Sequence, residues 1–275
     1  MKTLKNHTLL YDAQCPLCVG YTNTFVQTGM LDENGRYPFQ QIDKLTETNI
    51  DRARATNEIA LVNTKTKEVY YGVDSLLRVL GSSFPWIERI GKWYLVHYLL
   101  NKLYAFISYN RKVIISNPPN EQNICDCEPT FNYPYRIIYI VFATLLSAVI
   151  LTGYTNLLAG ITYPSFYSFE ISILIFQIPF QFLFLGSVKP KVLVNYTGHL
   201  VTVSFLGSLL LLPVWLVNTF IPLPLQTNIL YFLLVATFLW FHHKQRVENL
   251  RLPSRLSMSW AAYRILLLLI IIYFS

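Results

Sequence analysis

The stretch LLYDAQCPLCVGYTNTF, residues 9–25, decides how the first half of this chain is interpreted. Residues 7–12 (HTLLYD) are mainly apolar and predict a short buried strand. Apolar side chains then recur at helical spacing, and Gly29 suits a helix end, so a helix is predicted over residues 16–29. Cys15 and Cys18 therefore lie where a strand turns into a helix.

A C-x-x-C pair at such a turn is typical of thiol–disulfide chemistry. Cys15 falls at or just before the first helical residue, where free backbone N–H groups and the helix dipole stabilise a thiolate. Pro16 fits the first turn because no N–H is needed there. Cys18 lies one turn further on and can attack a mixed disulfide. We therefore predict that Cys15 is the nucleophile and Cys18 the resolving thiol.

Asp12 ends the predicted strand just before the two cysteines. A buried carboxyl group at this place can take up or return the proton of Cys18, which makes Asp12 the third predicted catalytic residue. The redox centre is the Cys15–Cys18 dithiol/disulfide itself. The pattern therefore predicts no further cofactor and no metal.

The rest of the first half predicts a small α/β domain. Strands are expected over 35–43, 58–63 and 68–72, and helices over 44–56 and 73–83. The resulting order, βαβαββα, is that of the thioredoxin fold. We assign this domain to residues 1–84, followed at 85–115 by an amphipathic aromatic extension that can cover the domain or lie in a membrane interface.

The residues also resemble a known family. YDAQCPLC is similar to the D-x-x-C-x-x-C signature of the DCC thiol-disulfide oxidoreductase family, which is named after these three residues. VYYGVDSLLRVL (69–80) resembles the strand–turn–helix of that family, and LYAFISYNRKVI (103–114) resembles its closing helix. The resemblance covers about residues 7–114.

The resemblance implies a thioredoxin-like fold and a disulfide oxidoreductase role, with Asp12, Cys15 and Cys18 as the defining residues. The chain departs from the common pattern at Ala13, where the family has glycine. It also has no proline in TNEIALV (56–62), where thioredoxins place one before the third strand.

A second cysteine pair, Cys125 and Cys127, lies in the Pro/Asn-rich linker predicted over 116–135. Three interpretations stay open. The pair can be a thiol relay that exchanges with Cys15, it can join Cys15 and Cys18 in a four-thiolate zinc site, or it can be two free thiols.

The second half has the composition of a membrane-embedded region. Of the 22 Lys/Arg and 15 Asp/Glu side chains, 27 precede residue 136. About 20 consecutive apolar residues span a bilayer as a helix. We therefore predict an all-α transmembrane region over 136–275, with about five spans. They are expected at about 137–154, 167–187, 199–220, 226–242 and 260–274, the last one short.

The loop charges predict an orientation. Arg111, Lys112 and Arg136 precede the first span, and loops 188–198 and 243–259 are basic, whereas the two intervening loops have no Lys or Arg. The positive-inside rule then places the N-terminus inside and the C-terminus outside. The first residues also lack the apolar run of a secretory signal peptide. We expect a bacterial cytoplasmic (inner) membrane protein with its first domain in the cytoplasm.

The favoured function is a membrane-tethered thiol–disulfide oxidoreductase with its CPLC centre on the cytoplasmic face. The alternatives are a multi-pass transporter or small-molecule handler with a thiol domain as redox sensor, and a structural zinc-binding thiol domain. The expected partners are the lipid bilayer and a protein or small-molecule thiol or disulfide. Nucleic acid is not expected, because the first 135 residues are nearly neutral, with 14 basic and 13 acidic side chains.

Overall fold

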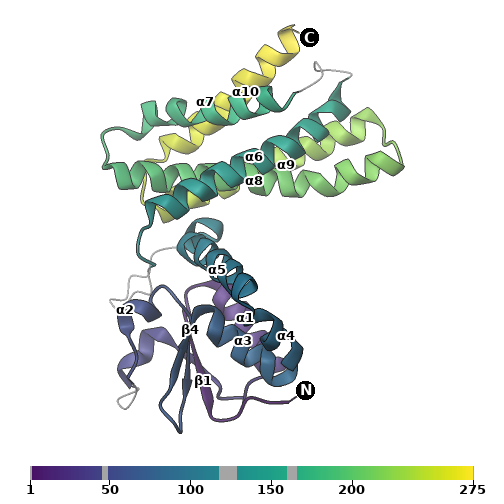
Figure 1. Ribbon diagram of the computed structural model, residues 1–275. Helices are drawn as coiled ribbons and strands as arrows, with labels where there is room; N and C mark the ends of the chain where they lie inside the picture. Colours follow the sequence, from purple (N-terminus) through teal and green to yellow (C-terminus); the bar gives the residue numbers. More distant parts are fainter. Residues whose placement is uncertain (1, 45–48, 118–128, 160–165, 275) are drawn as a thin grey trace. The chain divides into compact units, whose positions relative to one another are not determined.

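The computed structural model divides the chain into two compact units (Figure 1). The units are Met1–Tyr135 and Arg136–Ser275, and the described residues are 2–44, 49–117, 129–159 and 166–274. Each unit has buried clusters of its own side chains, in the sheet of the first and between the helices of the second.

Among its described residues, the first unit holds a mixed sheet in the strand order β2-β1-β3-β4. The strands are β1 (His7–Tyr11), β2 (Arg36–Pro38), β3 (Ala60–Asn63) and β4 (Val69–Tyr71). β1 is parallel to β2 and antiparallel to β3, and β3 is antiparallel to β4. The chain thus follows the predicted order of elements, and the thioredoxin-like fold is confirmed.

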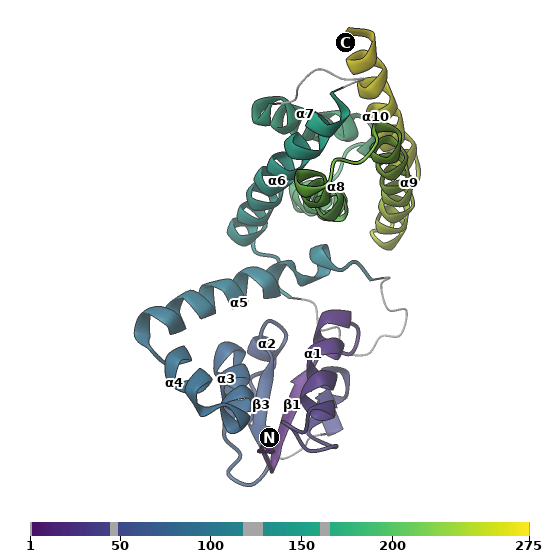
Figure 2. The ribbon, with the colours of Figure 1, turned by 90° about the vertical axis from the view of Figure 1, so that its right-hand side faces the viewer.

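Helical segments cover both faces of this sheet (Figure 2). They are α1 (Pro16–Gln27), η1 (Phe39–Lys44), α2 (Arg52–Ala55), α3 (Gly72–Ser83), α4 (Pro85–Gly91) and α5 (Tyr94–Ile114). Successive strand residues point to opposite faces. Leu9 and Leu61 therefore pack on the side of α1, α3 and α5, whereas Leu10 and Ala60 pack on the side of η1 and α2.

Two expected helical stretches differ in detail. The helix predicted over 44–56 contains only the short α2 in its described part, because Asp51 caps a new helix by accepting the Arg54 N–H at 3.0 Å. The aromatic stretch after residue 84 forms two helices. Pro85 occupies the first turn of α4, where no backbone N–H is needed, and the helix ends at Lys92 and Trp93 before α5 begins.

The described part of the second unit is helical. Its elements are α6 (Tyr133–Thr155), η2 (Asn156–Leu158), α7 (Tyr167–Leu185), α8 (Pro190–Phe220), α9 (Leu225–Asn249) and α10 (Arg255–Phe274). Four described helices, α6 to α9, are long and apolar enough to cross a membrane by length and composition. They match the first four predicted spans. The fifth predicted span falls in α10, which is not one of the four.

Polar side chains inside this unit bind one another across helices. Arg264 donates to Gln177 Oε1 at 2.6 Å, and the Tyr139 and Thr202 hydroxyls lie 2.8 Å apart. Glu170 is buried and accepts from the Thr155 hydroxyl at 3.0 Å. In an apolar surrounding such groups need internal partners, so these contacts hold the helices together.

Candidate dithiol site

The two cysteines lie at the turn from β1 to α1. Cys15 is the N-cap residue of α1, with extended backbone angles, and Pro16 occupies the first helical turn. The backbone N–H of Cys18 donates to Cys15 Sγ at 3.4 Å. The sulfur of Cys15 therefore takes the place that a serine or aspartate oxygen takes at other helix N-termini.

Both cysteines are free thiols and nearly buried, with 5% of Cys15 and 8% of Cys18 exposed. The pKa of Cys15 is lowered to about 6 by a hydrogen bond from the Cys18 thiol, by the Cys18 N–H and by the charge of Arg111, against the opposing effects of burial and Asp12. The pKa of Cys18 is raised, because its proton is shared with Cys15 and its surroundings are buried. The site thus favours the thiolate form of Cys15 and the thiol form of Cys18.

This separation predicts a pH dependence. In the reduced protein, Cys15 should react with iodoacetamide at half its maximal rate near pH 6, because only the thiolate is the nucleophile. The thiolate fraction, and with it the rate, rises as the pH increases through this value, while Cys18 stays unmodified. Peptide mass spectrometry of pH-stepped samples measures both rates. A Cys15 midpoint near the ordinary thiol value of about 8.5, as expected in denatured protein, would show that the fold does not activate it.

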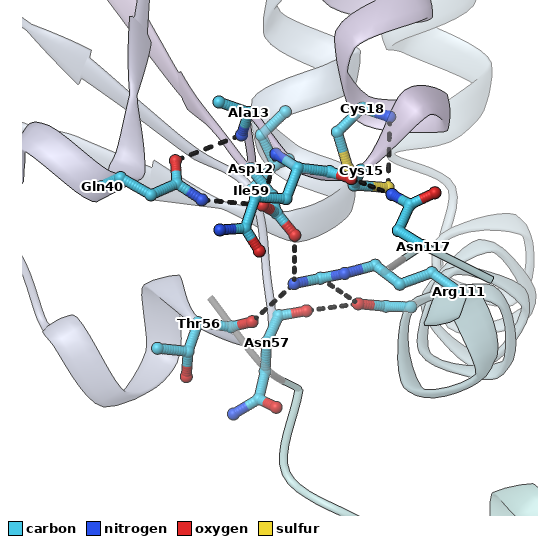
Figure 3. A network of polar contacts seen from close by, with 12 residues as sticks. Asp12, Ala13, Cys15, Cys18, Gln40, Thr56, Asn57, Ile59, Arg111 and Asn117 are labelled. Carbon is cyan, nitrogen blue, oxygen red and sulfur yellow. Dashed lines mark hydrogen bonds and ion pairs between the residues drawn. The ribbon is translucent and has the colours of Figure 1, made fainter. Parts of the chain in front are cut away.

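Asp12 follows β1 and points toward the end of α5 (Figure 3). Its side chain is buried, with the residue 4% exposed. Oδ1 accepts from the Gln14 N–H at 3.0 Å and from Gln40 Nε2 at 2.9 Å, and Oδ2 lies 3.5 Å from Arg111 Nη2. Three donors thus hold the carboxylate in one orientation.

Arg111 enters the site from the last turn of α5. Its Nη2 also donates to the Thr56 carbonyl at 3.1 Å, and Nη1 donates to Ser108 Oγ at 3.4 Å. Ser108 Oγ in turn donates to the Asn57 carbonyl. These bonds join α5 to the segment that leads into β3, so the ion pair is part of the structure around the cysteines (Figure 3).

Sequence reasoning missed Arg111 as a site residue and counted it as a basic charge before the first span. It is 7% exposed and faces Asp12. Arg111 therefore no longer counts among the basic loop residues from which the membrane orientation was predicted. One signal was present, because the stretch that resembles the closing helix of the DCC family contains Asn110-Arg111 near its end. Both of these polar residues are buried.

A small cavity lies between Cys18 and the Asp12–Arg111 ion pair. Its volume is about 20 Å³, and its lining includes Cys18, Asp12, Arg111, Tyr21 and Tyr104. Apolar side chains such as Leu10 and Phe39 complete the wall, and a space of this size with several polar groups in its wall holds about one water molecule. Tyr104 is anchored there by accepting the Ile59 N–H at 2.8 Å. Asp12 and Cys18 thus both line this cavity.

Cys125 and Cys127 lie outside the described residues. The described chain on both sides of them is held near the site. The Asn117 amide donates to the Gln14 carbonyl, and Thr130 donates from its N–H to Asn57 Oδ1 at 2.8 Å. Within the described ranges, no group of three or more His, Cys, Asp or Glu side chains is arranged to hold a metal ion.

Comparison with known proteins gave one finding for this region. Residues 9–116 match the model of the DCC1-like thiol-disulfide oxidoreductase family. The matched residues include the whole of the CPLC turn and Arg111, and they confirm the resemblance inferred from the sequence. Neither the curated proteins nor the solved structures gave a significant match to this chain.

Proposed function

We propose that the DCC1-like thiol-disulfide oxidoreductase domain at residues 9–116 is the redox-active part of a membrane-tethered enzyme. The observation that supports this most strongly is the state of Cys15. Its sulfur is the N-cap group of α1 and accepts the Cys18 N–H at 3.4 Å, and its pKa is lowered to about 6. Cys15 is then mainly thiolate at neutral pH, which is the form that attacks disulfides.

In the first step, the Cys15 thiolate attacks one sulfur of a substrate disulfide. A Cys15–substrate disulfide forms, and the other substrate sulfur leaves as a thiolate that takes a proton from solvent. In the second step, the Cys18 thiol loses its proton and attacks Cys15 Sγ. The Cys15–Cys18 disulfide forms and the second substrate sulfur leaves. The substrate disulfide is reduced to two thiols while the dithiol is oxidised.

Asp12 serves the second step. Its carboxylate is held in place by Arg111 and two N–H donors, and we propose that it accepts the proton of Cys18. Cys18 and Asp12 share the cavity of about 20 Å³, and one water there would carry the proton from sulfur to carboxylate. Burial, which persists in the Cys15–substrate disulfide, raises the pKa of Cys18 and makes such a base useful.

A thiol donor must then return the disulfide to the dithiol. We propose a small-molecule thiol or a dithiol protein, because the first unit would lie on the cytoplasmic side of a bacterial inner membrane, where thiols are kept reduced. The orientation is supported by the remaining loop charges, among them Lys112, Lys189 and Lys191. Under these conditions the site acts as a reductant.

We further propose that Cys125 and Cys127 relay electrons between Cys15 and the donor. Asn117 and Thr130 are both bonded to residues beside the dithiol site. The chain from Asn117 to Cys125 extends to roughly 27 Å at most, so the pair stays within reach of Cys15. This anchoring of the flanking residues favours the relay over two unconnected thiols.

A second candidate function is a membrane transporter or small-molecule handler whose thiol domain is a redox sensor. It is favoured by ionisable groups inside the helical unit, such as Arg264 against Gln177 and Arg246 at 3.1 Å from His199. Ionisable residues inside a membrane are often functional. Solute binding that changes with the redox state of Cys15 and Cys18 would distinguish this function from the enzyme.

Reduction of insulin disulfides tests the proposed enzyme. With reduced glutathione as donor, the full chain in detergent should accelerate insulin reduction, and Cys15→Ser should return the rate to that of glutathione alone. Thr24→Ser, an exposed change on the same helix, is the matched control and should keep the wild-type rate. Equal rates for the wild type and Cys15→Ser would contradict a catalytic role for the dithiol.

A further inference from the structure

The outer side of α4 and α5 carries large apolar side chains that no other part of the described chain covers. These exposed residues form what we call the α5 face. They are Trp86, Ile90, Trp93, Tyr94, Leu95, Tyr98, Leu99, Leu103 and Ile107. Tyr94 is 89% exposed and Trp93 is 68% exposed, whereas the C-terminal turns of α5 are buried against the domain.

The pattern along α5 is that of an amphipathic helix with an apolar outer side. Leu95, Leu99 and Leu103 follow one another at four-residue spacing and lie on one side. Lys102 is the charged residue among them, and its Nζ lies 5.4 Å from the centre of the Tyr98 ring. A lysine in this position can lay its stem along apolar surface and keep its ammonium group in water.

The chemistry of the face fits a lipid–water interface better than an aqueous surface. Trp and Tyr side chains prefer the head-group level of a bilayer. The charges of α4 and α5 are also complementary to anionic lipids. Glu88, the acidic residue there, is bonded to Lys92 at 2.6 Å, while Arg89 and Lys102 are exposed. Basic amphipathic helices with aromatic residues typically bind membrane surfaces.

A second observation concerns a groove that borders this face. An open groove of about 350 Å³ is lined by Tyr94, His97, Tyr98, Asn101, Lys102 and Tyr135. Tyr135 belongs to the first turn of α6, stacks on Tyr109 with ring centres 5.2 Å apart, and accepts from Asn110 at 3.1 Å. Tyr135 lies at the start of a candidate span, where tyrosine side chains prefer the head-group level of a bilayer.

We propose that the α5 face lies in the interface of the bilayer that α6 to α9 span, with its aromatic and leucine side chains among the upper acyl chains and Arg89 and Lys102 on anionic head groups. The proposal rests on the membrane anchoring proposed above, but not on the redox chemistry. Because α5 also supplies Arg111 to the dithiol site, lipid binding would hold that site beside the membrane surface.

Photo-crosslinking tests this surface in the full chain. The protein is reconstituted into nanodiscs that contain phosphatidylglycerol, with p-benzoylphenylalanine in place of Leu99 or, separately, Leu95. The same group in place of Val141, an exposed residue of α6, reports whether that helix is in the bilayer. In place of Lys65, an exposed residue between β3 and β4, it is the aqueous control. The Cys15 alkylation midpoint verifies that each variant is folded.

We expect lipid adducts at positions 95, 99 and 141, and none at 65. Lipid adducts at 141 but not at 95 or 99 would overturn the proposal and leave the membrane anchoring intact. Adducts of 95 and 99 to another part of the chain, or to a second copy, would overturn it as well. If position 141 also gives no lipid adduct, the membrane assignment of α6 fails, and the proposal fails with it.

Discussion

Cys18→Ser is expected to leave the protein linked to its substrate through Cys15. Serine cannot attack the Cys15–substrate disulfide, so the reaction stops after the first step and the adduct accumulates. The wild type should show the adduct only transiently. Non-reducing electrophoresis followed by peptide mass spectrometry, after addition of insulin or in cells, measures the adduct and identifies the attached thiol.

Three matched variants make this result specific. Cys15→Ser and Cys15→Ser/Cys18→Ser should form no adduct, because the nucleophile is absent. Cys18→Ser/Cys125→Ser/Cys127→Ser should still trap the substrate. If the relay operates, Cys18→Ser alone should in addition give a fraction of the protein in which Cys15 is joined to Cys125 or Cys127. An adduct that survives in Cys15→Ser would assign the attacking role to another cysteine.

Arg111→Met is expected to lower the free energy of unfolding of the first unit by about 3–5 kcal/mol, the usual cost of removing one partner from a buried ion pair. Asp12 is 4% exposed and would lose the guanidinium that lies 3.5 Å from its Oδ2. The same variant should raise the pKa of Cys15, because the charge of Arg111 lowers it. Limited proteolysis against temperature measures the first effect, and the pH dependence of alkylation measures the second.

Three further variants separate the effect of charge from that of packing at the Asp12–Arg111 pair. Arg111→Lys keeps the positive charge and should leave the Cys15 midpoint closer to pH 6 than Arg111→Met does. Asp12→Asn removes the charge that raises the pKa of Cys15 and should shift the midpoint to lower pH. The double variant Asp12→Asn/Arg111→Met should be more stable than the sum of the single effects predicts. Additive losses and an unchanged midpoint would show that the ion pair does not act on the dithiol.

The local part of this site could be predicted from the sequence. An apolar run, a C-x-x-C pair with proline in the first turn, and helical spacing place Cys15 at a helix start. The structure has Cys15 at the N-cap of α1, and Gly29 after the helix at a φ of 71°. Strands of the first unit were also found, because their hydrophobic patterns are short and bounded by turn residues. The strand predicted over 35–43 is shorter, since β2 covers only Arg36–Pro38 and the chain continues as η1.

The partner of Asp12 could not be found in this way. Arg111 is separated from Asp12 by 99 positions in the sequence, and only the packing of α5 on the domain brings them together. An arginine in the last turn of a helix before an apolar stretch has the same local pattern as a topology charge. Arg111 is buried in the site because of its tertiary contact with Asp12, and the local sequence pattern does not encode that contact.

The central claim is that Cys15 attacks a disulfide and Cys18 resolves it, and rapid-quench mass spectrometry of the reduced full chain tests it most directly. After mixing with glutathione disulfide, the account predicts a glutathione adduct on Cys15 that decays as the Cys15–Cys18 disulfide forms with loss of two hydrogen atoms. A stable adduct on Cys15, a first adduct on Cys18, or no reaction faster than that of a free thiol would contradict it.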